Sequence, residues 1–231
     1  MIAAEALPAR AGTLEAEILQ SLFPSGCAVA IRTEPGNVSD LFESEAAFVR
    51  DACASRRAEF AAGRACVRQA LRDVGAPPYA ILPDDCRAPI WPHGLVGSIS
   101  HCPGLCVAVI AHRLLRKAIG VDVETNDRLA DGIRDIVATP VEREELARLR
   151  GSLACDPLKL LFVIKEALFK LYFPAARHFL EFHHMRVSLD PAVGAFEGAL
   201  VDNAAPSAFG RRRFAGRFGV TDGYLMAGGM I

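Results

Sequence analysis

A six-residue segment that begins at Ile119 and ends at Glu124 alternates apolar and acidic side chains. Successive side chains of a strand point to opposite faces, so this spacing predicts a strand with apolar residues such as Val121 on one face and Asp122 and Glu124 on the other. The apolar face can enter a core while the two carboxylates face a cleft. Two neighbouring carboxylates repel each other unless a cation lies between them, which indicates a site for a hard metal such as Mg²⁺. A strand with a solvated acidic edge is the alternative, and this segment alone leaves both interpretations open.

The composition is that of an ordinary globular protein. The chain has 231 residues, of which 52% are apolar and 23% charged, enough for one large domain or two small ones. The formal net charge of −1 gives no bulk attraction to nucleic acid or to an anionic membrane, so we expect no nucleic-acid partner. The amino terminus lacks the basic-then-apolar order of a secretory signal, and charged residues interrupt every apolar run before about 18 residues. We therefore expect no membrane span and a cytoplasmic location.

The seven cysteines show no pattern of a metal site. None of them forms a CxxC pair, and although Cys102 and Cys106 flank a Pro-Gly turn, no second pair completes four ligands. We therefore expect small buried or half-buried thiols in a reducing compartment.

Hydrophobic periodicity and turn residues divide the chain into helices and strands. Helices are predicted within 43–74, at 133–137, from Pro140 to about Arg150, and from Pro157 to Phe173, where Pro174 is expected to end the last one. Strands are predicted at 27–31, 96–101, 105–111, 119–124, 185–189, 195–200, 213–220 and 224–227. Helices accompany strand pairs in each half, so we predict an α+β fold of two halves, residues 1–115 and 116–231, with a cleft between them.

Two groups of side chains in the first half are candidates for binding an anion. Arg57, Arg64 and Arg68 lie on one side of a predicted helix; such a row is usually a solvated face, and it gains interest only beside a phosphate-bearing ligand. Ser100 and His101 end a Ser-x-Ser-His sequence at the mouth of the predicted hairpin, where they form a polar cluster.

The long helix of the second half carries a further acid with two bases. Glu166 and Lys170 are four residues apart and are therefore neighbours on one helix face. One interpretation is a surface salt bridge that contributes about 0.3–0.5 kcal/mol to stability. The other is a third carboxylate directed at the metal of the acidic strand, with Lys165 and Lys170 positioned for a phosphate.

Five blocks of this sequence, in this order, resemble those of the 4′-phosphopantetheinyl transferases of the large monomeric type, in the branch of enterobactin synthetase component D. Asp-x-Glu alone or Lys-Glu-Ala alone would be a weak signal, whereas five ordered blocks are a strong one. The blocks span residues 57–170 and read Arg57-Ala-Glu-Phe-Ala-Ala-Gly-Arg64, Arg87-Ala-Pro-Ile-Trp-Pro92, Gly97-Ser-Ile-Ser-His-Cys102, Gly120-Val-Asp-Val-Glu124 and Phe162-Val-Ile-Lys-Glu-Ala-Leu-Phe-Lys170.

The resemblance implies an α/β fold of two pseudo-symmetric halves that bind coenzyme A and Mg²⁺ between them, with Mn²⁺ as a substitute metal. It implies a monomer that moves 4′-phosphopantetheine from coenzyme A to a serine of an apo acyl or peptidyl carrier protein and releases adenosine 3′,5′-bisphosphate. Carriers of siderophore, polyketide or nonribosomal peptide assembly are the implied partners. The amino-terminal half would hold the nucleotide, and the carboxyl half would hold the metal and the catalytic helix.

The resemblance also assigns the catalytic and metal-binding residues. Asp122, Glu124 and Glu166 are the implied metal ligands. Glu166 is in addition the implied base that takes the proton of the carrier serine. Lys170 is the second implied catalytic residue. A metal-adjacent carboxylate is an adequate base if it reaches the serine directly or through one water.

The implied coenzyme A contacts are basic or polar side chains from both halves. Lys165 and Lys170 would hold its phosphates. Ser100 and His101 would contact the nucleotide end, with His101 near the 3′-phosphate. The basic surface around the nucleotide would be completed by three arginines, Arg57, Arg64 and Arg87. Arginine offers bidentate grips on phosphate, and such local groups are needed because the chain has no net positive charge.

The chain departs from the family pattern in two places. Phe162 stands where many relatives carry Trp, a change of volume that should not touch the chemistry. Little of the family pattern is recognisable after Tyr172, so the contacts to the carrier protein stay unassigned.

Two other functions fit part of the pattern. A metal-dependent phosphohydrolase would explain the acids and bases but not the Trp91-Pro92 loop or the pair Ser100-His101. A non-catalytic coenzyme A-binding module would tolerate the loss of acids such as Glu166, yet all three are present.

Overall fold

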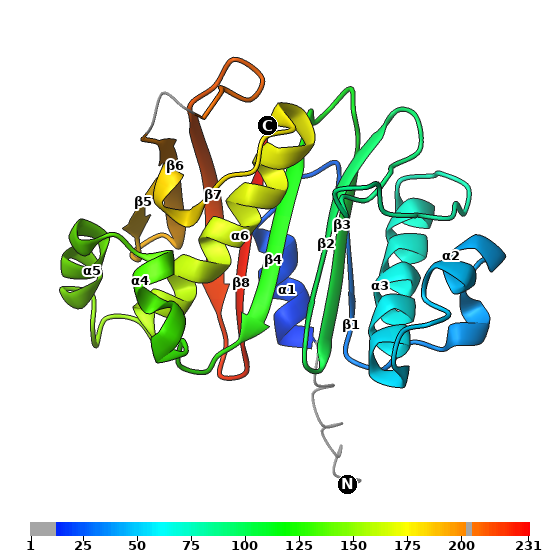
Figure 1. Ribbon diagram of the computed structural model, residues 1–231, viewed down its shortest axis with the longest axis horizontal. Helices are drawn as coiled ribbons and strands as arrows, with labels where there is room; N and C mark the ends of the chain where they lie inside the picture. The colour runs from blue at the N-terminus through cyan, green and yellow to red at the C-terminus, as the bar shows by residue number, and fades with distance from the viewer. Residues whose placement is uncertain (1–12, 202–204) are drawn as a thin grey trace, which may run out of the picture.

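Two antiparallel sheets form the frame of the protein, in a computed structural model that describes residues 13–201 and 205–231. The first sheet has the strand order β1-β3-β2 and the second the order β4-β8-β7-β6-β5 (Figure 1). The strands are β1 (Cys27–Arg32), β2 (Leu95–Cys102), β3 (Leu105–His112), β4 (Ile119–Thr125), β5 (Met185–Asp190), β6 (Ala195–Leu200), β7 (Arg213–Val220) and β8 (Tyr224–Met230). All eight predicted strands are confirmed, with small differences at their ends.

Each sheet is crossed by one helix of 20 residues, α3 on the first and α6 on the second. This arrangement confirms the predicted α+β fold. The two halves are related only loosely, because their sheets have three and five strands. The domain boundary between residues 115 and 116 stays a prediction. The helices are α1 (Thr13–Ser21), α2 (Glu43–Phe48), α3 (Ala54–Asp73), α4 (Arg134–Val137), α5 (Pro140–Ala147) and α6 (Pro157–Ala176).

The end of α6 differs from the prediction. The helix continues through Pro174 and closes at Arg177, whose left-handed backbone (φ 50°) lets its N–H bond the carbonyl of Phe173 at 2.8 Å. A proline inside a helix removes one backbone donor and crowds the preceding turn. In the last turn few bonds remain to be lost, so the helix accommodates it. A second difference is smaller: α5 ends at Ala147 and not near Arg150.

Serine side chains join the two sheets where β2 runs beside β4 (Figure 1). The hydroxyl of Ser98 accepts the N–H of Val121 at 3.1 Å, and that of Ser100 accepts the N–H of Val123 at 3.3 Å. These contacts, called here the serine seam, stand where a continuous sheet would have backbone carbonyls. They fix β4 against the first sheet and set which way its side chains point.

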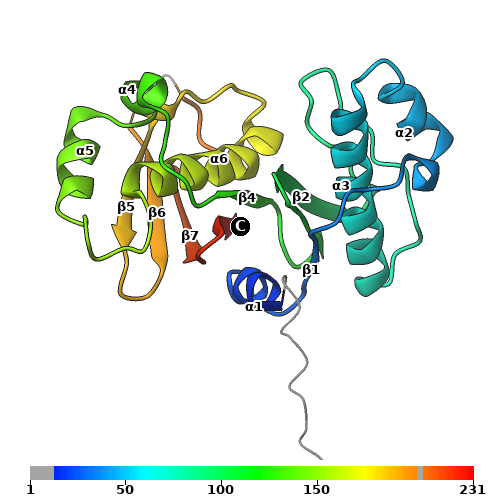
Figure 2. The ribbon, with the colours of Figure 1, turned by 90° about the horizontal axis from the view of Figure 1, so that it is seen from below.

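The alternation along β4 has the predicted consequence. Ile119, Val121 and Val123 are almost completely buried in a cluster shared with α1, β1 and β3, and α1 lies beneath the join of the two sheets (Figure 2). The opposite face of β4, which carries Gly120 and Asp122, packs against α6. The strand is therefore covered on both faces, and the interpretation as a solvated edge is wrong for Asp122.

We expect Gly120→Ala to destabilise the protein, because β4 and α6 approach too closely for a side chain there. A Cβ atom at this position would lie 2.0 Å from the carbonyl oxygen of Ala167, so the helix backbone must move. Overpacking of this kind costs about 1–3 kcal/mol of the free energy of unfolding, measured by urea denaturation. Gly132→Ala is the matched control, because a Cβ there meets nothing within 4 Å. Equal stability of the two variants would contradict the close approach.

Two further expectations concern the burial of the cysteines and the lack of a membrane-spanning helix. All seven cysteines are free, and five are buried or half-buried as predicted. Cys53 and Cys86 are exposed, because they lie just before α3 and in a surface turn respectively. No helix within residues 13–201 and 205–231 is long and apolar enough to cross a membrane.

Candidate active site

Asp122 is the centre of a polar network at the serine seam. Its side chain is 6% exposed, and its Oδ1 accepts hydrogen bonds from the Ser100 hydroxyl and the Lys170 ammonium, both at 2.7 Å. Lys170 also donates to the Ser100 hydroxyl at 2.9 Å. The second oxygen, Oδ2, is buried and has no hydrogen-bond partner among the described residues. A buried carboxylate oxygen without a partner is costly, so it indicates a place where a ligand completes the site.

Two further carboxylates, those of Glu166 and Glu124, contribute to the electrostatics around Asp122. Burial raises the pKa of Glu166, the negative charges of Asp122 and Glu124 add to the rise, and Lys170 opposes it. Glu124 forms an ion pair with Lys159 at 3.2 Å. Lysines from α6 thus neutralise both acids of β4, whereas Glu166 is held in a negative field.

The three acids suit a hard cation in type and charge. Carboxylate oxygens are the protein ligands that Mg²⁺ prefers, and a cation would relieve both the orphaned oxygen of Asp122 and the mutual repulsion that raises the pKa of Glu166. Within the described residues, no three acidic, histidine or cysteine side chains are already gathered as a metal-binding group. Instead, the ammonium groups of Lys170 and Lys159 pair with Asp122 and Glu124. A metal would replace these ammonium groups as the positive charge beside the carboxylates.

Ser100 lies at the site but in a different role from the predicted one. It was expected to meet the nucleotide end of coenzyme A, but the side chain is buried between β2 and β4, and its hydroxyl already serves Asp122, Lys170 and Val123. It therefore positions the acid and the lysine.

His101 faces an arginine that sequence reasoning missed. Its Nε2 lies 2.9 Å from Nη1 of Arg56, and burial lowers the pKa of His101, with the Arg56 charge lowering it further. Arg56 lies seven residues before Gly63, which packs against Ile99 of β2. Seven residues are about two helical turns, so Arg56 lies on the side of α3 that faces β2. The sequence alone does not show which side of the helix this is, so it held no signal for Arg56.

The structure brings neither predicted arginine of α3 to the acids. Arg57 donates to the carbonyl of Arg50 at 3.3 Å. Arg64 is buried, donates to the carbonyl of Ile81 at 2.7 Å, and lies 3.7 Å from Glu45. Burial lowers the pKa of Arg64 to about 10. Arg64 therefore holds the first half together and cannot form part of an open phosphate seat.

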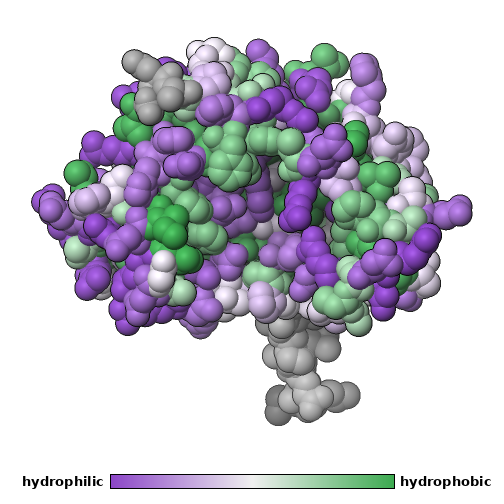
Figure 3. Space-filling model, in the orientation of Figure 1, coloured by the Kyte–Doolittle hydropathy of each residue, from purple (hydrophilic) through white to green (hydrophobic). Residues whose placement is uncertain are grey.

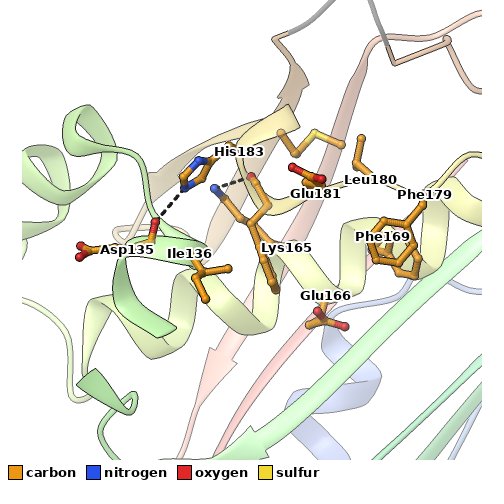
Figure 4. A pocket seen from close by; sticks show the side chains of 11 residues that line it. Asp135, Ile136, Lys165, Glu166, Phe169, Phe179, Leu180, Glu181 and His183 are labelled. Carbon is orange, nitrogen blue, oxygen red and sulfur yellow. Dashed lines mark hydrogen bonds between the residues drawn. The ribbon is translucent and has the colours of Figure 1, made fainter. Parts of the chain in front are cut away.

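Lys165 also departs from its predicted role. Its side chain is 2% exposed, and its ammonium donates to Glu142 and to the carbonyls of Val137 and Phe182, each at 2.9 Å. Figure 4 shows Lys165 directed toward the segment of His183, with Glu166 on the other side of the helix. With its three donors satisfied, Lys165 is a structural residue that joins α6 to its neighbours, and a phosphate contact conflicts with this placement.

Two cavities meet at Glu166. One, of about 670 Å³, has a mainly apolar lining that includes Phe169, Phe179 and Leu180 (Figure 4). The other, of about 240 Å³, lies between the two halves and is lined by Arg87, Lys170 and Glu166 among others. The surface is hollowed between the halves, and hydrophilic residues gather there (Figure 3). A ligand with an apolar arm and an anionic part could occupy both cavities and pass Glu166 at their junction.

The site combines the parts needed for transfer of a phosphoryl group. Asp122 and the neighbouring acids could hold a cation, Lys170 provides a positive charge, and Glu166 is half-buried with a raised pKa, which suits a general base. Of the residues predicted from the sequence, the structure brings together Asp122, Glu166, Lys170, Ser100 and Arg87, with Glu124 and His101 at the edge.

Known proteins match the chain over both halves. The sequence profile described as the 4′-phosphopantetheinyl transferase N-terminal domain matches residues 44–111, and that of the 4′-phosphopantetheinyl transferase superfamily matches residues 118–220. The chain is 39% identical to 4′-phosphopantetheinyl transferase Svp of Streptomyces mobaraensis over 194 residues, which cover 82% of this chain and 78% of Svp.

Two further relatives extend this picture. The chain is 32% identical to 4′-phosphopantetheinyl transferase PptT of Mycobacterium tuberculosis over 222 residues, 93% of this chain and 96% of PptT. It is 37% identical to enterobactin synthase component D of Salmonella typhimurium over 132 residues, 54% of this chain and 51% of that protein.

Proposed function

The chain belongs to the 4′-phosphopantetheinyl transferase superfamily, and on this premise we propose that Asp122, Glu166 and Lys170 carry out its reaction at the serine seam. The protein is a transferase that moves 4′-phosphopantetheine from coenzyme A to a serine of a carrier protein and leaves adenosine 3′,5′-bisphosphate. The alternatives, a phosphohydrolase or a non-catalytic binding module, have less support. One observation carries the site assignment: Glu166 lines both cavities and feels the negative charge of Asp122, whose second oxygen has no hydrogen-bond partner among the described residues.

Each part of coenzyme A has a chemically suited place. The pantetheine arm is long and carries methyl and methylene groups between its two amides, so we assign it to the mainly apolar cavity lined by Phe169 and Phe179. The nucleotide and the phosphates belong to the cavity between the halves, where Arg87 and Lys170 offer positive charge. The pyrophosphate then passes the junction at Glu166, which is the position of the bond to be broken.

The chemical step is an in-line substitution at phosphorus. Glu166 takes the proton of the carrier serine, and the serine oxygen forms a bond to the phosphorus that bears pantetheine. The bond from this phosphorus to the bridging oxygen breaks, and adenosine 3′,5′-bisphosphate leaves with the electron pair. Lys170 stabilises the negative charge that builds up on the phosphate oxygens.

Mg²⁺, with Mn²⁺ as a substitute, is the proposed metal, held by Asp122, Glu124 and Glu166. Bound there, the metal would neutralise the negative charge of the pyrophosphate of coenzyme A. Without the metal, Lys170 and Lys159 stay paired with Asp122 and Glu124 and do not neutralise the pyrophosphate, so removal of divalent metal by a chelator should abolish transfer.

The proposed partners follow from the reaction. The protein is proposed to act as a monomer on apo acyl or peptidyl carrier proteins, in the cytoplasm, where coenzyme A is available. Enterobactin synthase component D is named for a siderophore, and carriers of siderophore, polyketide or nonribosomal peptide assembly are the first substrates to test.

The mass of the carrier protein tests the function directly. The protein is incubated with coenzyme A, Mg²⁺ and a panel of purified apo carriers, and each carrier is weighed by mass spectrometry. We expect a gain of about 340 Da on one serine, the formula mass of the transferred group, with release of one bisphosphate per carrier. Hydrolysis of coenzyme A without modification of any carrier would favour the phosphohydrolase instead.

We expect His101→Ala to raise the KM for coenzyme A about tenfold and to leave the KM for dephospho-coenzyme A within about twofold. The reason is the pair of His101 with Arg56, 2.9 Å apart at the nucleotide side of the site, which would hold the 3′-phosphate. Steady-state kinetics with the two donors provides the measurement.

The neighbouring arginines provide the control for this contact. Arg56→Ala should share the selective loss on coenzyme A, whereas Arg57→Ala should behave like the parent, because Arg57 bonds the carbonyl of Arg50. An equal loss on both donors in His101→Ala would refute the 3′-phosphate contact.

A further inference from the structure

An ion pair joins the two halves beyond the acids of the serine seam. Nη1 of Arg177, the residue that caps α6, lies 2.7 Å from Oδ2 of Asp84 in the first half. The Asp84 side chain is 19% exposed and that of Arg177 54%. The Arg177 guanidinium also lies over the ring of Phe173, 5.4 Å from its centroid, which limits the positions that it can adopt. The contact therefore ties the end of the catalytic helix to a loop of the other half.

Asp84 organises the turn that carries Arg87. Its Oδ1 accepts the N–H groups of Cys86 and Ala88, both at 2.9 Å, and its own backbone carbonyl accepts the N–H of Arg87 at 2.8 Å. Arg87 has a left-handed backbone with a φ of 66°, which is unfavourable for a residue with a Cβ. The turn is thus held in a strained form by its backbone hydrogen bonds, among them that of the Asp84 N–H to the Ala88 carbonyl at 2.8 Å, and by the Asp84 carboxylate. Oδ2 of this carboxylate is the oxygen that Arg177 contacts.

The ion pair bridges two walls of the same cavity. The turn forms one wall of the cavity between the halves through Arg87 and its neighbours, and the end of α6 forms the other through Phe173 and Pro174. Asp84 lies just before the first wall and Arg177 just after the second. A change in this contact would alter the width of the cavity and the position of Arg87, but not the acids of β4.

We propose that the ion pair of Asp84 with Arg177 is a latch between the halves that holds the Arg87 turn in place and so sets the affinity for coenzyme A. Both residues are positioning residues, because they act through the turn. This inference rests on the proposed function, since it takes coenzyme A as the occupant of the cavity. It predicts an effect on donor binding and on the mobility of the turn, and none on the chemical step.

The first test measures coenzyme A binding and turnover in Arg177→Ala and Asp84→Asn. Asparagine keeps an oxygen for the N–H groups of the turn but loses the charge that attracts Arg177. A partly exposed ion pair supports about a two- to fivefold effect, so each variant should raise the calorimetric Kd and the KM for coenzyme A by that factor, with kcat unchanged. Arg177→Lys, which keeps the charge, should recover part of the affinity.

The double variant Asp84→Asn/Arg177→Ala separates a latch from direct contact with the ligand. A latch predicts that the double variant binds no more weakly than either single variant, because both remove the same interaction. Losses that multiply would mean that Arg177 touches coenzyme A itself and would overturn the latch.

Hydrogen exchange provides a readout that needs neither coenzyme A nor carrier. Amides of residues 82–90 should exchange faster in Arg177→Ala, by about the same factor, and unchanged exchange would overturn the proposal. Arg186→Ala is the matched control, because Arg186 is 52% exposed and pairs with Glu145 at 2.6 Å far from the cavity. Absence of carrier modification by the parent protein would refute the proposed function instead, and the exchange result would still decide whether the turn is latched.

Discussion

Replacement of Glu166 by Gln is expected to lower kcat by at least about 100-fold while the protein stays folded. General base catalysis contributes about 10²–10⁴-fold, and the amide has the shape of the acid but cannot accept the serine proton. The raised pKa of Glu166 adds a second expectation. A carboxyl group whose folded pKa lies above its unfolded value destabilises the folded state once the pH exceeds both values. At neutral pH the metal-free Gln variant should therefore unfold at a higher temperature than the parent.

The same substitution on an exposed glutamate serves as the control. Glu144→Gln on α5 should leave both turnover and unfolding temperature unchanged. A kcat for Glu166→Gln within about threefold of the parent, roughly 0.7 kcal/mol in the activation free energy, would contradict the assignment of the base.

Lys165→Met is expected to lose about 3–5 kcal/mol of the free energy of unfolding and thus to affect stability more than coenzyme A binding. The substitution leaves Glu142, 1% exposed, as an unpaired buried carboxylate. Breaking a buried ion pair by removing one partner costs about this much, a large part of the typical 5–15 kcal/mol stability of a protein. Urea denaturation gives the midpoint and the slope from which the loss is calculated.

A second substitution distinguishes the unpaired charge from lost packing. Lys165→Met/Glu142→Gln removes the stranded charge and keeps an oxygen for the N–H of Val187. Because the NH2 group of the glutamine then faces the N–H of Thr139, which the second oxygen of Glu142 accepts, the double variant should recover part of the stability. Lys117→Met, at an exposed position, should change stability by less than about 0.5 kcal/mol. A Lys165→Met protein of parental stability with a tenfold higher KM for coenzyme A would restore the phosphate contact that the sequence suggested.

Local periodicity explains why part of the site could be predicted. The alternation along β4 placed Asp122 away from the apolar face, and the spacing of four residues put Glu166 beside Lys170. Both are properties of one strand or one helix, so no knowledge of distant contacts was needed. The same rules argue against two other assignments. Lys165 and Glu166 are adjacent on a helix and Ser100 and His101 are adjacent on a strand, so the two side chains of each pair point in different directions.

Distant partners account for the remaining differences between the predicted and the observed placement of side chains. Arg64 looked like a free cation because its partners, Glu45 and the carbonyl of Ile81, are separated from it by 19 and 17 residues in the sequence. The latch between Asp84 and Arg177 joins residues 93 apart. Such pairs depend on how the halves pack, which the spacing of residues within one element does not reveal.

The location of the metal tests the central claim most directly. Crystals grown with coenzyme A and Mn²⁺ would give an anomalous signal that locates the metal without reference to activity. We predict one strong peak at the serine seam, within coordination distance of carboxylate oxygens of Asp122, Glu124 and Glu166 and of the coenzyme A pyrophosphate. A crystal with bound coenzyme A and no peak there, or with the peak at another group of residues, would contradict the claim.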